Sequence, residues 1–169
     1  MQWRKKNDVV VIQRTGSGKS VSECIRSLHY SLHSSTGSSF LLSTISLIPN
    51  QVDDLKEKGI NAIPFGNPAG KEKINYIALL DEKEKEKPSL FYMTPECFSK
   101  HMHFFAQHRD EIKMVVLDEA HKIFDRNSGF RQCYESLKEI PVKFPSTPVA
   151  ALTATIDSVS LHTLCKEYL

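Results

Sequence analysis

The most constraining feature of this chain is a short apolar run that leads directly into a glycine-rich turn. The run spans residues 9–12, and the turn reads Thr15-Gly16-Ser17-Gly18-Lys19-Ser20. Apolar residues then recur at the spacing of one helix face, at Val21, Cys24, Ile25, Leu28 and Leu32. A buried strand, a glycine turn and an amphipathic helix in this order predict a phosphate-binding loop in an α/β domain.

The residue types of this turn suit nucleotide binding. Gly16 and Gly18 let successive backbone N–H groups converge on phosphate oxygens, and the helix that follows adds its positive N-terminal end. Lys19 is expected to reach the terminal phosphates of ATP, and the Ser20 hydroxyl to coordinate Mg²⁺. The match to G-x-x-x-x-G-K-[ST] is imperfect, because Gln13 stands at the first position. A plain strand-to-helix turn is the alternative interpretation.

A second polar segment supplies what a phosphate loop needs for hydrolysis, namely an acid for the metal and a group that orients water. The apolar run 114–117 ends in Asp118-Glu119-Ala120-His121. Asp118 is the expected Mg²⁺ partner, and Glu119 is the candidate base that polarises the attacking water. Two acids that merely start a helix are the structural alternative. That alternative does not account for the position of the pair after a phosphate loop.

Short apolar runs alternate with helical patterns along the rest of the chain. The predicted strands are residues 9–12, 40–42, 60–64, 89–93, 114–117 and 149–152. Pro49 suits the first turn of a helix, and Gly59 suits its C-terminal stop. Strands that are apolar on both faces and alternate with helices favour a parallel sheet covered on both sides. We therefore expect one three-layer α/β domain over residues 1–169, with a mainly parallel central sheet.

Composition and charge narrow the classes of function. With 22 basic and 20 acidic side chains the net charge is +2, so any contact with nucleic acid must be local. The four cysteines are scattered without a C-x-x-C spacing, which favours reduced intracellular thiols over disulfides or a zinc site. We expect no signal peptide and no membrane span, since the apolar runs are short.

Several aromatic and histidine pairs have two possible interpretations. His101 and His103 could pair on a strand, but without a nearby thiol or carboxylate cluster we expect surface or packing histidines rather than a metal site. Phe104 and Phe105 lie in a helix-like run and are expected in the core rather than on a base-stacking platform.

Three ordered motifs resemble motifs I, II and III of superfamily 2 helicases. They are Thr15 to Ser20, Asp118-Glu119-Ala120-His121 and Thr153-Ala154-Thr155. Other segments narrow the resemblance to RecQ-family DNA helicases. Residues 45–55 resemble the region with S-L-M-x-D-Q-V, Phe91 to Glu96 resembles Y-x-x-P-E, and Phe130-Arg131 through Tyr134 resembles F-R-x-x-Y. The resemblance extends over nearly the whole chain.

The resemblance implies the first RecA-like domain of an ATP-dependent, 3′-to-5′ DNA-unwinding motor. It assigns ATP·Mg²⁺ binding and hydrolysis to Lys19, Ser20, Asp118 and Glu119. It assigns the relay of nucleotide state to His121 and to Thr153, Ala154 and Thr155. Contacts near single-stranded DNA or coupling to it are implied for Ser46, Gln51, Thr94, Pro95, Glu96, Phe130 and Arg131.

The chain also departs from the family pattern. Only residues 1–8 precede the first strand, where RecQ enzymes carry a segment that reads adenine. Arg126 stands where a tryptophan normally couples DNA binding to hydrolysis. The chain stops after the third motif, so we expect no second RecA-like domain and no arginine finger within it. Weak binding of single-stranded DNA and low ATPase activity are the expected consequences.

The sequence leaves three functions to be compared. The first is the ATPase domain of a RecQ-like helicase that does not unwind DNA alone and partners a second RecA-like domain in a longer protein. The second is a catalytically weak ATP- or DNA-binding remnant that acts as a binding module. A small P-loop kinase is disfavoured, because it has no use for Thr153-Ala154-Thr155. The first two functions imply an intracellular protein, nuclear in a eukaryote.

Overall fold

The computed structural model describes residues 8–12, 38–44, 46–65, 89–125 and 131–169. The predicted phosphate loop, Thr15 to Ser20, lies outside these residues, as do Arg126 and Phe130. Arg131 is described in its backbone only.

Strands and helices alternate along the described residues, as the apolar pattern predicts. The strands are β1 (Val9–Ile12), β2 (Ser38–Leu42), β3 (Ala62–Pro64), β4 (Ser89–Met93), β5 (Ile112–Leu117) and β6 (Val149–Thr153). The α-helices are α2 (Ile48–Glu57), α4 (Pro95–Gln107), α5 (Arg131–Ser136), α6 (Ile140–Lys143) and α7 (Ser158–Glu167). Three 3₁₀ turns join them, η1 (Arg109–Glu111), η2 (Ala120–Phe124) and η3 (Leu137–Glu139).

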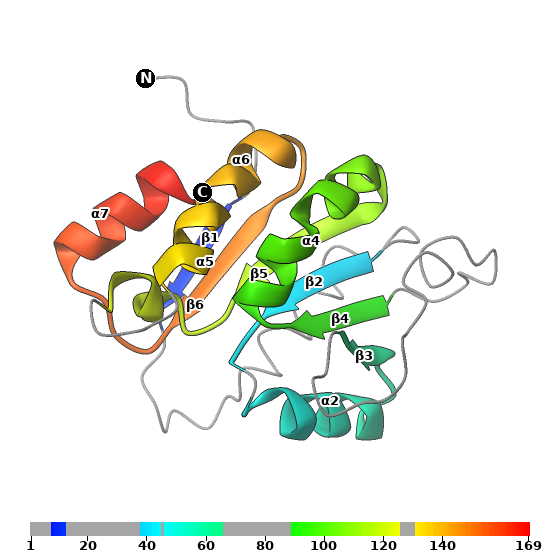
Figure 1. Cartoon of the computed structure of the whole chain (residues 1–169). Coiled ribbons are helices and arrows are strands. Elements are labelled where there is room, and N and C mark those ends of the chain that lie inside the picture. The colour runs from blue at the N-terminus through cyan, green and yellow to red at the C-terminus, as the bar shows by residue number, and fades with distance from the viewer. Residues whose placement is uncertain (1–7, 13–37, 45, 66–88, 126–130) are drawn as a thin grey trace.

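Within the described residues, the strands form one six-stranded sheet in the order β1-β6-β5-β2-β4-β3 (Figure 1). Every strand pair in it is parallel. All strands therefore end at the same edge of the sheet, which is where ligands bind in open α/β folds. The predicted parallel sheet is confirmed.

The order of the strands corrects one expectation. We expect from the sequence that the strand before the phosphate loop and the strand before Asp118 are neighbours. In the structure β6 lies between β1 and β5 and pairs with both. Strand order depends on how the connecting segments pack, which an apolar run does not encode. The insertion of β6 brings Thr153 to the edge between the two predicted halves of the site.

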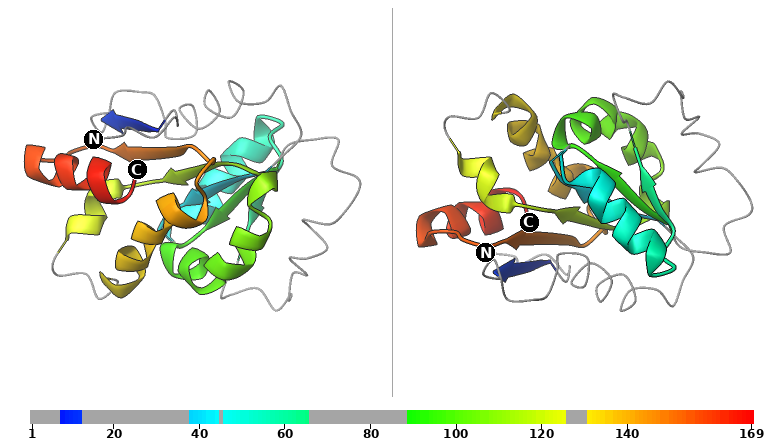
Figure 2. Two further views of the ribbon diagram at one scale, coloured as in Figure 1. Left: turned by 90° about the horizontal axis from the view of Figure 1, so that it is seen from above. Right: turned by 90° about the horizontal axis from the view of Figure 1, so that it is seen from below.

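Each strand alternates its side chains between two helical layers, as the two-residue period of a strand requires. Toward α4, α5, α6 and α7 the sheet buries Phe40, Leu42, Phe91, Met93, Val115, Leu117, Val149 and Ala151. Toward α2 it buries Leu41, Leu90, Tyr92, Met114, Val116, Ala150 and Leu152. The two views in Figure 2 show these helices arranged about the sheet. The predicted three-layer architecture is confirmed.

Helix α4 begins with the caps that its sequence supplies. The Thr94 hydroxyl accepts a hydrogen bond from the backbone N–H of Cys97 at 3.2 Å, and Pro95 occupies the first turn, where its missing N–H costs nothing. The side chains of Phe98, Met102 and Phe105 then follow at helical spacing and are buried.

Two expectations for this region have different outcomes. His101 and His103 lie on α4 rather than on a strand, because the helical apolar period of residues 98–105 continues through them. Phe105 is fully buried and Phe104 partly buried, so their predicted place in the core is confirmed.

Among the described residues, no group of three or more potential metal ligands occurs. None of the described helices is long and apolar enough to cross a membrane.

Gly59 ends α2 in the left-handed conformation, with φ 75°. An L-residue pays a steric penalty there, so Gly59→Ala is expected to lower the free energy of unfolding by about 1 kcal/mol. Space is not the cause, because nothing lies within 4 Å of an added Cβ. Gly59→Asn should cost less, since asparagine tolerates this conformation. Urea unfolding measures both variants, and equal stability of Gly59→Ala and the parent would contradict the turn.

Candidate active site

Asp118 lies at the end of β5, at the carboxyl edge of the sheet. Its backbone N–H donates to the carbonyl of Leu42 at 2.9 Å, which ties the residue to the end of β2. Its side chain is buried, with only 8% of the residue exposed. A carboxylate in this position faces the ligand edge of the fold without being freely hydrated.

Three donors hold the Asp118 carboxylate. Ser43 Oγ donates to Oδ2 at 2.9 Å, and Gln51 Nε2 approaches the same oxygen at 3.5 Å. The backbone N–H of Glu119 donates to Oδ1 at 2.9 Å. The donors come from the loop after β2, from α2 and from the turn after β5, so the carboxylate joins three segments.

Burial raises the pKa of Asp118, the hydrogen bonds from Ser43 and Gln51 oppose that shift, and the charge of Glu119 adds to it. A buried carboxylate is costly unless a cation or donors compensate it. Among the described side chains, no lysine, arginine or histidine forms an ion pair with Asp118. Carboxylate oxygens are the ligands that Mg²⁺ prefers. The chemistry of Asp118 therefore fits a divalent cation.

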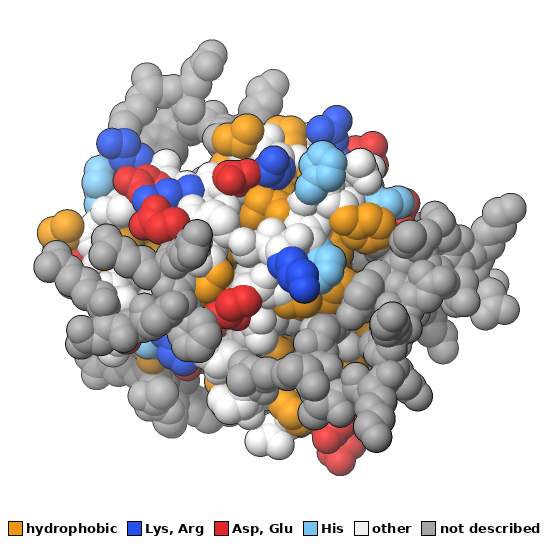
Figure 3. All heavy atoms as spheres, viewed as in Figure 1, with side chains coloured by type: hydrophobic (Ala, Val, Ile, Leu, Met, Phe, Trp, Pro, Cys, Tyr) orange, Lys and Arg blue, Asp and Glu red, His pale blue; other side chains and the backbone are white. Residues whose placement is uncertain are grey.

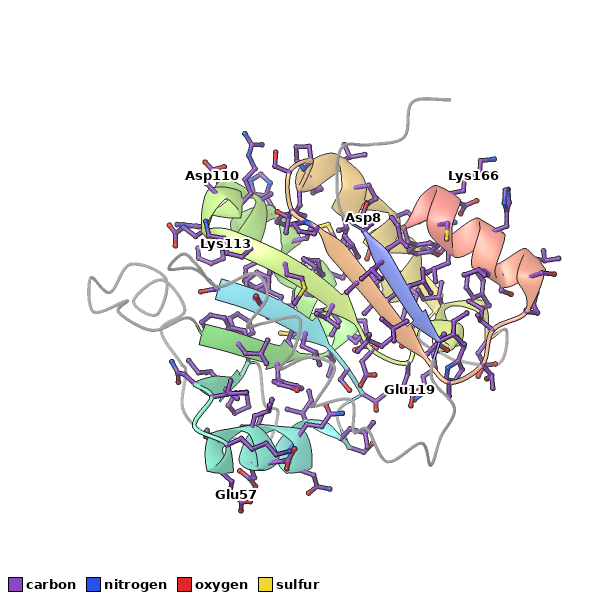
Figure 4. All side chains as sticks on the ribbon, turned by 180° about the vertical axis from the view of Figure 1, so that it is seen from behind. Asp8, Glu57, Asp110, Lys113, Glu119 and Lys166 are labelled. Atoms are coloured by element: carbon purple, nitrogen blue, oxygen red, sulfur yellow. The ribbon has the colours of Figure 1, made fainter. Side chains whose placement is uncertain are left out.

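Glu119 occupies a turn with an unusual backbone. It has φ 51° and ψ 45°, and it is the only non-glycine residue with positive φ in the described part of the chain. Such a conformation costs about 1–3 kcal/mol and is typical of functional sites. Figure 4 shows Glu119 at the end of the sheet opposite Asp110 and Lys113. The Glu119 side chain is 29% exposed, so the two adjacent carboxylates lie in different environments.

His121 connects Glu119 to the end of β6. Its Nδ1 lies 3.2 Å from Glu119 Oε2 and 3.1 Å from Thr153 Oγ1. Thr153 Oγ1 donates its own proton to the carbonyl of Thr155 at 2.9 Å, so it can only accept from the histidine. These contacts require a proton on His121 Nδ1. The DEAH segment and the Thr153-Ala154-Thr155 segment are thereby linked through one imidazole.

Of the residues that the resemblance assigns to DNA, those that the structure describes with their side chains lie at the same edge but in different settings. Ser46 is exposed in the turn before α2, whereas Gln51 directs its amide toward Asp118. Thr94, Pro95 and Glu96 form the start of α4, directly after β4.

Glu96 contacts the neighbouring helix rather than standing free at the surface. Its Oε1 accepts a hydrogen bond from Cys133 Sγ of α5 at 3.3 Å. The neighbouring Tyr134 is buried, and burial raises its pKa to about 12, with the charge of Glu96 adding to the shift. Glu96 and Tyr134 thus belong to the packing between α4 and α5.

Sequence reasoning missed two residues of this site. Ser43 is fully buried against Asp118, and Tyr92 lies in the layer between the sheet and α2, with its hydroxyl buried and without a hydrogen-bond partner in the described structure. Burial raises the pKa of Tyr92, and the charges of Asp118 and Asp54 add to that shift. A signal for Ser43 existed, since it is a polar residue directly after a buried strand, as Asp118 is.

Residues 1–163 match the DEAD/DEAH box helicase family. A similar curated protein is the ATP-dependent DNA helicase Q-like 2 of Arabidopsis thaliana, 32% identical over 154 residues, which cover 88% of this chain and 21% of that protein. The ATP-dependent DNA helicase RecQ of Bacillus subtilis is 31% identical over 164 residues, which cover 96% of this chain and 27% of that protein. The chain thus spans about a quarter of the length of these relatives.

Two solved helicase structures share the fold. The Hef helicase domain of Pyrococcus furiosus aligns with a TM-score of 0.62 and 16% identity, over 95% of this chain and 33% of that one. A hypothetical ATP-dependent RNA helicase from Sulfolobus tokodaii aligns with a TM-score of 0.58 and 20% identity, over 95% of this chain and 45% of that one. With a family match over residues 1–163 and a RecA-like helicase fold, the chain belongs to the DEAD/DEAH box helicases, and its curated relatives named above are RecQ-type DNA helicases.

Proposed function

We propose that residues 1–169 form one RecA-like domain that binds and hydrolyses ATP in a RecQ-like, 3′-to-5′ DNA helicase. The observation that carries this proposal is the linked set of Asp118, Glu119, His121 and Thr153 at the carboxyl edge of the sheet. If these residues served only to pack the fold, a glutamate in a strained conformation between a buried acid and a histidine would not be needed.

The roles follow from the environment of each side chain. Asp118, with Ser20 of the predicted phosphate loop, would hold Mg²⁺, and the bound ion would supply positive charge to the phosphate oxygens. Glu119 is less buried than Asp118, and its carboxylate accepts a proton from the attacking water. Lys19 neutralises charge on the terminal phosphates. Different environments for two adjacent carboxylates favour different roles for them.

His121 is suited to report the state of Glu119 to the end of β6. Its Nδ1 proton is shared between Glu119 Oε2 and Thr153 Oγ1, so a change at the carboxylate alters the bond to the threonine. Thr155, whose carbonyl accepts from Thr153, is exposed at the same edge. We infer that this chain of contacts relays nucleotide state toward DNA.

Single-stranded DNA is the proposed partner, bound weakly. The charges do not form one basic surface on the face seen in Figure 3, where acidic and basic side chains of the described residues are interspersed. Contacts through hydroxyls, amides and helix N-termini would position the phosphate backbone with little net charge, so binding should be only moderately salt-dependent. We propose that DNA unwinding needs a second RecA-like domain in addition to this one. Because the protein is proposed to act on DNA, we also propose that it works inside the cell, and in the nucleus of a eukaryote.

A steady-state ATPase assay with titrated single-stranded oligonucleotide tests this function. We expect slow hydrolysis, micromolar or weaker DNA binding, and little stimulation by DNA, because Arg126 stands at the position of the coupling tryptophan. Arg126→Trp should increase the stimulation. Arg109→Trp, at an exposed arginine in η1 before β5, is the matched control and should leave the stimulation unchanged.

Two outcomes would contradict parts of the proposal. A large stimulation of the parent protein by DNA would disprove weak coupling. ATP binding without any turnover, in the presence or absence of DNA, would instead favour the alternative of a binding module.

A further inference from the structure

A small group of polar side chains lies next to Asp118, at the apolar layer between the sheet and α2. Ser43 Oγ and Gln51 Nε2 both approach Asp118 Oδ2, at 2.9 and 3.5 Å. Around them the layer is apolar, with Val52, Leu55 and Leu152 among its buried members. Polar side chains inside such a layer are costly unless they are bonded, so their convergence on one carboxylate oxygen is a specific feature.

The layer contains further hydrogen-bonding capacity. Gln51 Oε1 and Tyr92 Oη are buried, and neither has a partner in the described structure. Gln51 therefore uses only its amide nitrogen, toward Asp118, and leaves its oxygen unsatisfied. Leaving a buried acceptor unpaired is costly, because the desolvation of that atom is not compensated. An orientation that accepts this cost is more readily explained by a role at Asp118 than by packing of α2.

We propose that Gln51, together with Ser43, is a positioning residue that holds the Asp118 carboxylate for a divalent cation and ties α2 to the ion site. This inference rests on the proposed ATP·Mg²⁺ site. It gives Gln51 a role inside the domain, next to the role toward DNA that the resemblance implies for the same residue.

The number of donors supports the assignment. Two side-chain donors address Oδ2, while Oδ1 accepts one bond, from the Glu119 backbone N–H. A carboxylate has about four acceptor positions, so Oδ1 keeps capacity that Oδ2 has largely used. Partners that orient a metal ligand in this way typically contribute 10–100-fold to metal affinity.

The same contacts make α2 part of the site. Gln51 lies in the first half of that helix, one turn after the exposed turn that contains Ser46. A displacement of α2 relative to the sheet moves the Gln51 amide relative to Asp118, because Gln51 lies on the helix and Asp118 lies at the end of β5. The divalent cation and any ligand that moves α2 are therefore expected to influence each other's affinity, and to the same degree.

Calorimetry of ATP binding to the full chain, in EDTA and over a titration of MgCl₂, tests the proposal. Gln51→Met keeps the length of the side chain and removes its donor. We expect unchanged ATP affinity in EDTA and a Mg²⁺ midpoint raised about 10-fold or more. Lys56→Met, on the exposed side of α2, should keep the parent midpoint.

Conservative variants at Ser43 separate positioning from packing. Ser43→Ala should raise the Mg²⁺ midpoint, and Ser43→Thr, which retains the hydroxyl, should restore it. A Gln51→Met midpoint equal to that of the parent would overturn the proposal. An equal loss of affinity in EDTA and in MgCl₂ would overturn it as well, since that result indicates a general structural defect.

A readout without nucleotide distinguishes failure of this inference from failure of the proposed function. A double-mutant cycle of Gln51→Met with Asp118→Asn, followed by urea unfolding, should give a coupling between the two positions, whereas Lys56→Met with Asp118→Asn should give none. If the parent binds no ATP·Mg²⁺, the proposed function fails. A coupling between Gln51 and Asp118 in the cycle would then show only that the two side chains contact each other in the fold. If the parent binds ATP·Mg²⁺ and the cycle gives no coupling, the inference fails alone.

Discussion

Replacing Glu119 by glutamine is expected to abolish ATP hydrolysis while leaving ATP·Mg²⁺ binding largely intact. The amide has nearly the shape of the carboxylate but cannot accept a proton from the attacking water. General base catalysis typically contributes about 10²- to 10⁴-fold to a rate, so the variant should hydrolyse ATP slower than the parent by about that factor. The measurement is steady-state phosphate release, beside calorimetry of ATP binding.

The matched control for this experiment is Glu57→Gln. Glu57 is an exposed residue at the end of α2, away from the candidate site, as the labels in Figure 4 show. The control should hydrolyse ATP at the parent's rate. If Glu119→Gln also hydrolyses ATP at the parent's rate, Glu119 is not the base. If Glu119→Gln instead loses binding, the strained turn at Glu119 requires the carboxylate for its structure.

The second large effect is expected at Lys19. Its ammonium meets the densest negative charge of the ligand, so Lys19→Ala should weaken ATP·Mg²⁺ binding by about 1.5–3 kcal/mol, the range of a hydrogen bond to a charged group. That change corresponds to roughly 10- to 150-fold in the dissociation constant. Calorimetry measures it directly.

Lys166→Ala is the control, because Lys166 is an exposed lysine on α7. It should bind ATP·Mg²⁺ with the affinity of the parent. Unchanged affinity in Lys19→Ala would disprove phosphate binding by the glycine-rich turn, whatever the roles of Asp118 and Glu119. The two substitutions at Lys19 and Glu119 therefore test binding and hydrolysis separately.

Much of the fold follows from local sequence patterns. The predicted start and end of each strand in the described residues differ from the observed ones by at most two residues. The agreement arises because a buried parallel strand has a continuous apolar sequence. The end of α2 also follows from sequence, since Gly59 acts through local backbone chemistry. His101 and His103 could have paired on a strand, but they lie on α4, whose buried residues Phe98, Met102 and Phe105 follow the helical period.

Part of the site also follows from sequence. Asp118 and Glu119 stand directly after an apolar run, and polar residues that follow parallel strands meet at one edge of the sheet. Thr153 follows the same rule, since it ends β6. This rule does not say which strand ends are adjacent in the sheet.

The sequence by itself determined the parallel α/β class, the candidate acids and the DEAD/DEAH resemblance, because these depend on residues close together in the chain. Only the tertiary structure decided that β6 separates β1 from β5, that His121 bridges Glu119 and Thr153, and that Gln51 turns toward Asp118. Those features join residues 32 and 67 positions apart in the chain. Contacts of that range arise from the packing of whole elements, which no local period or motif specifies.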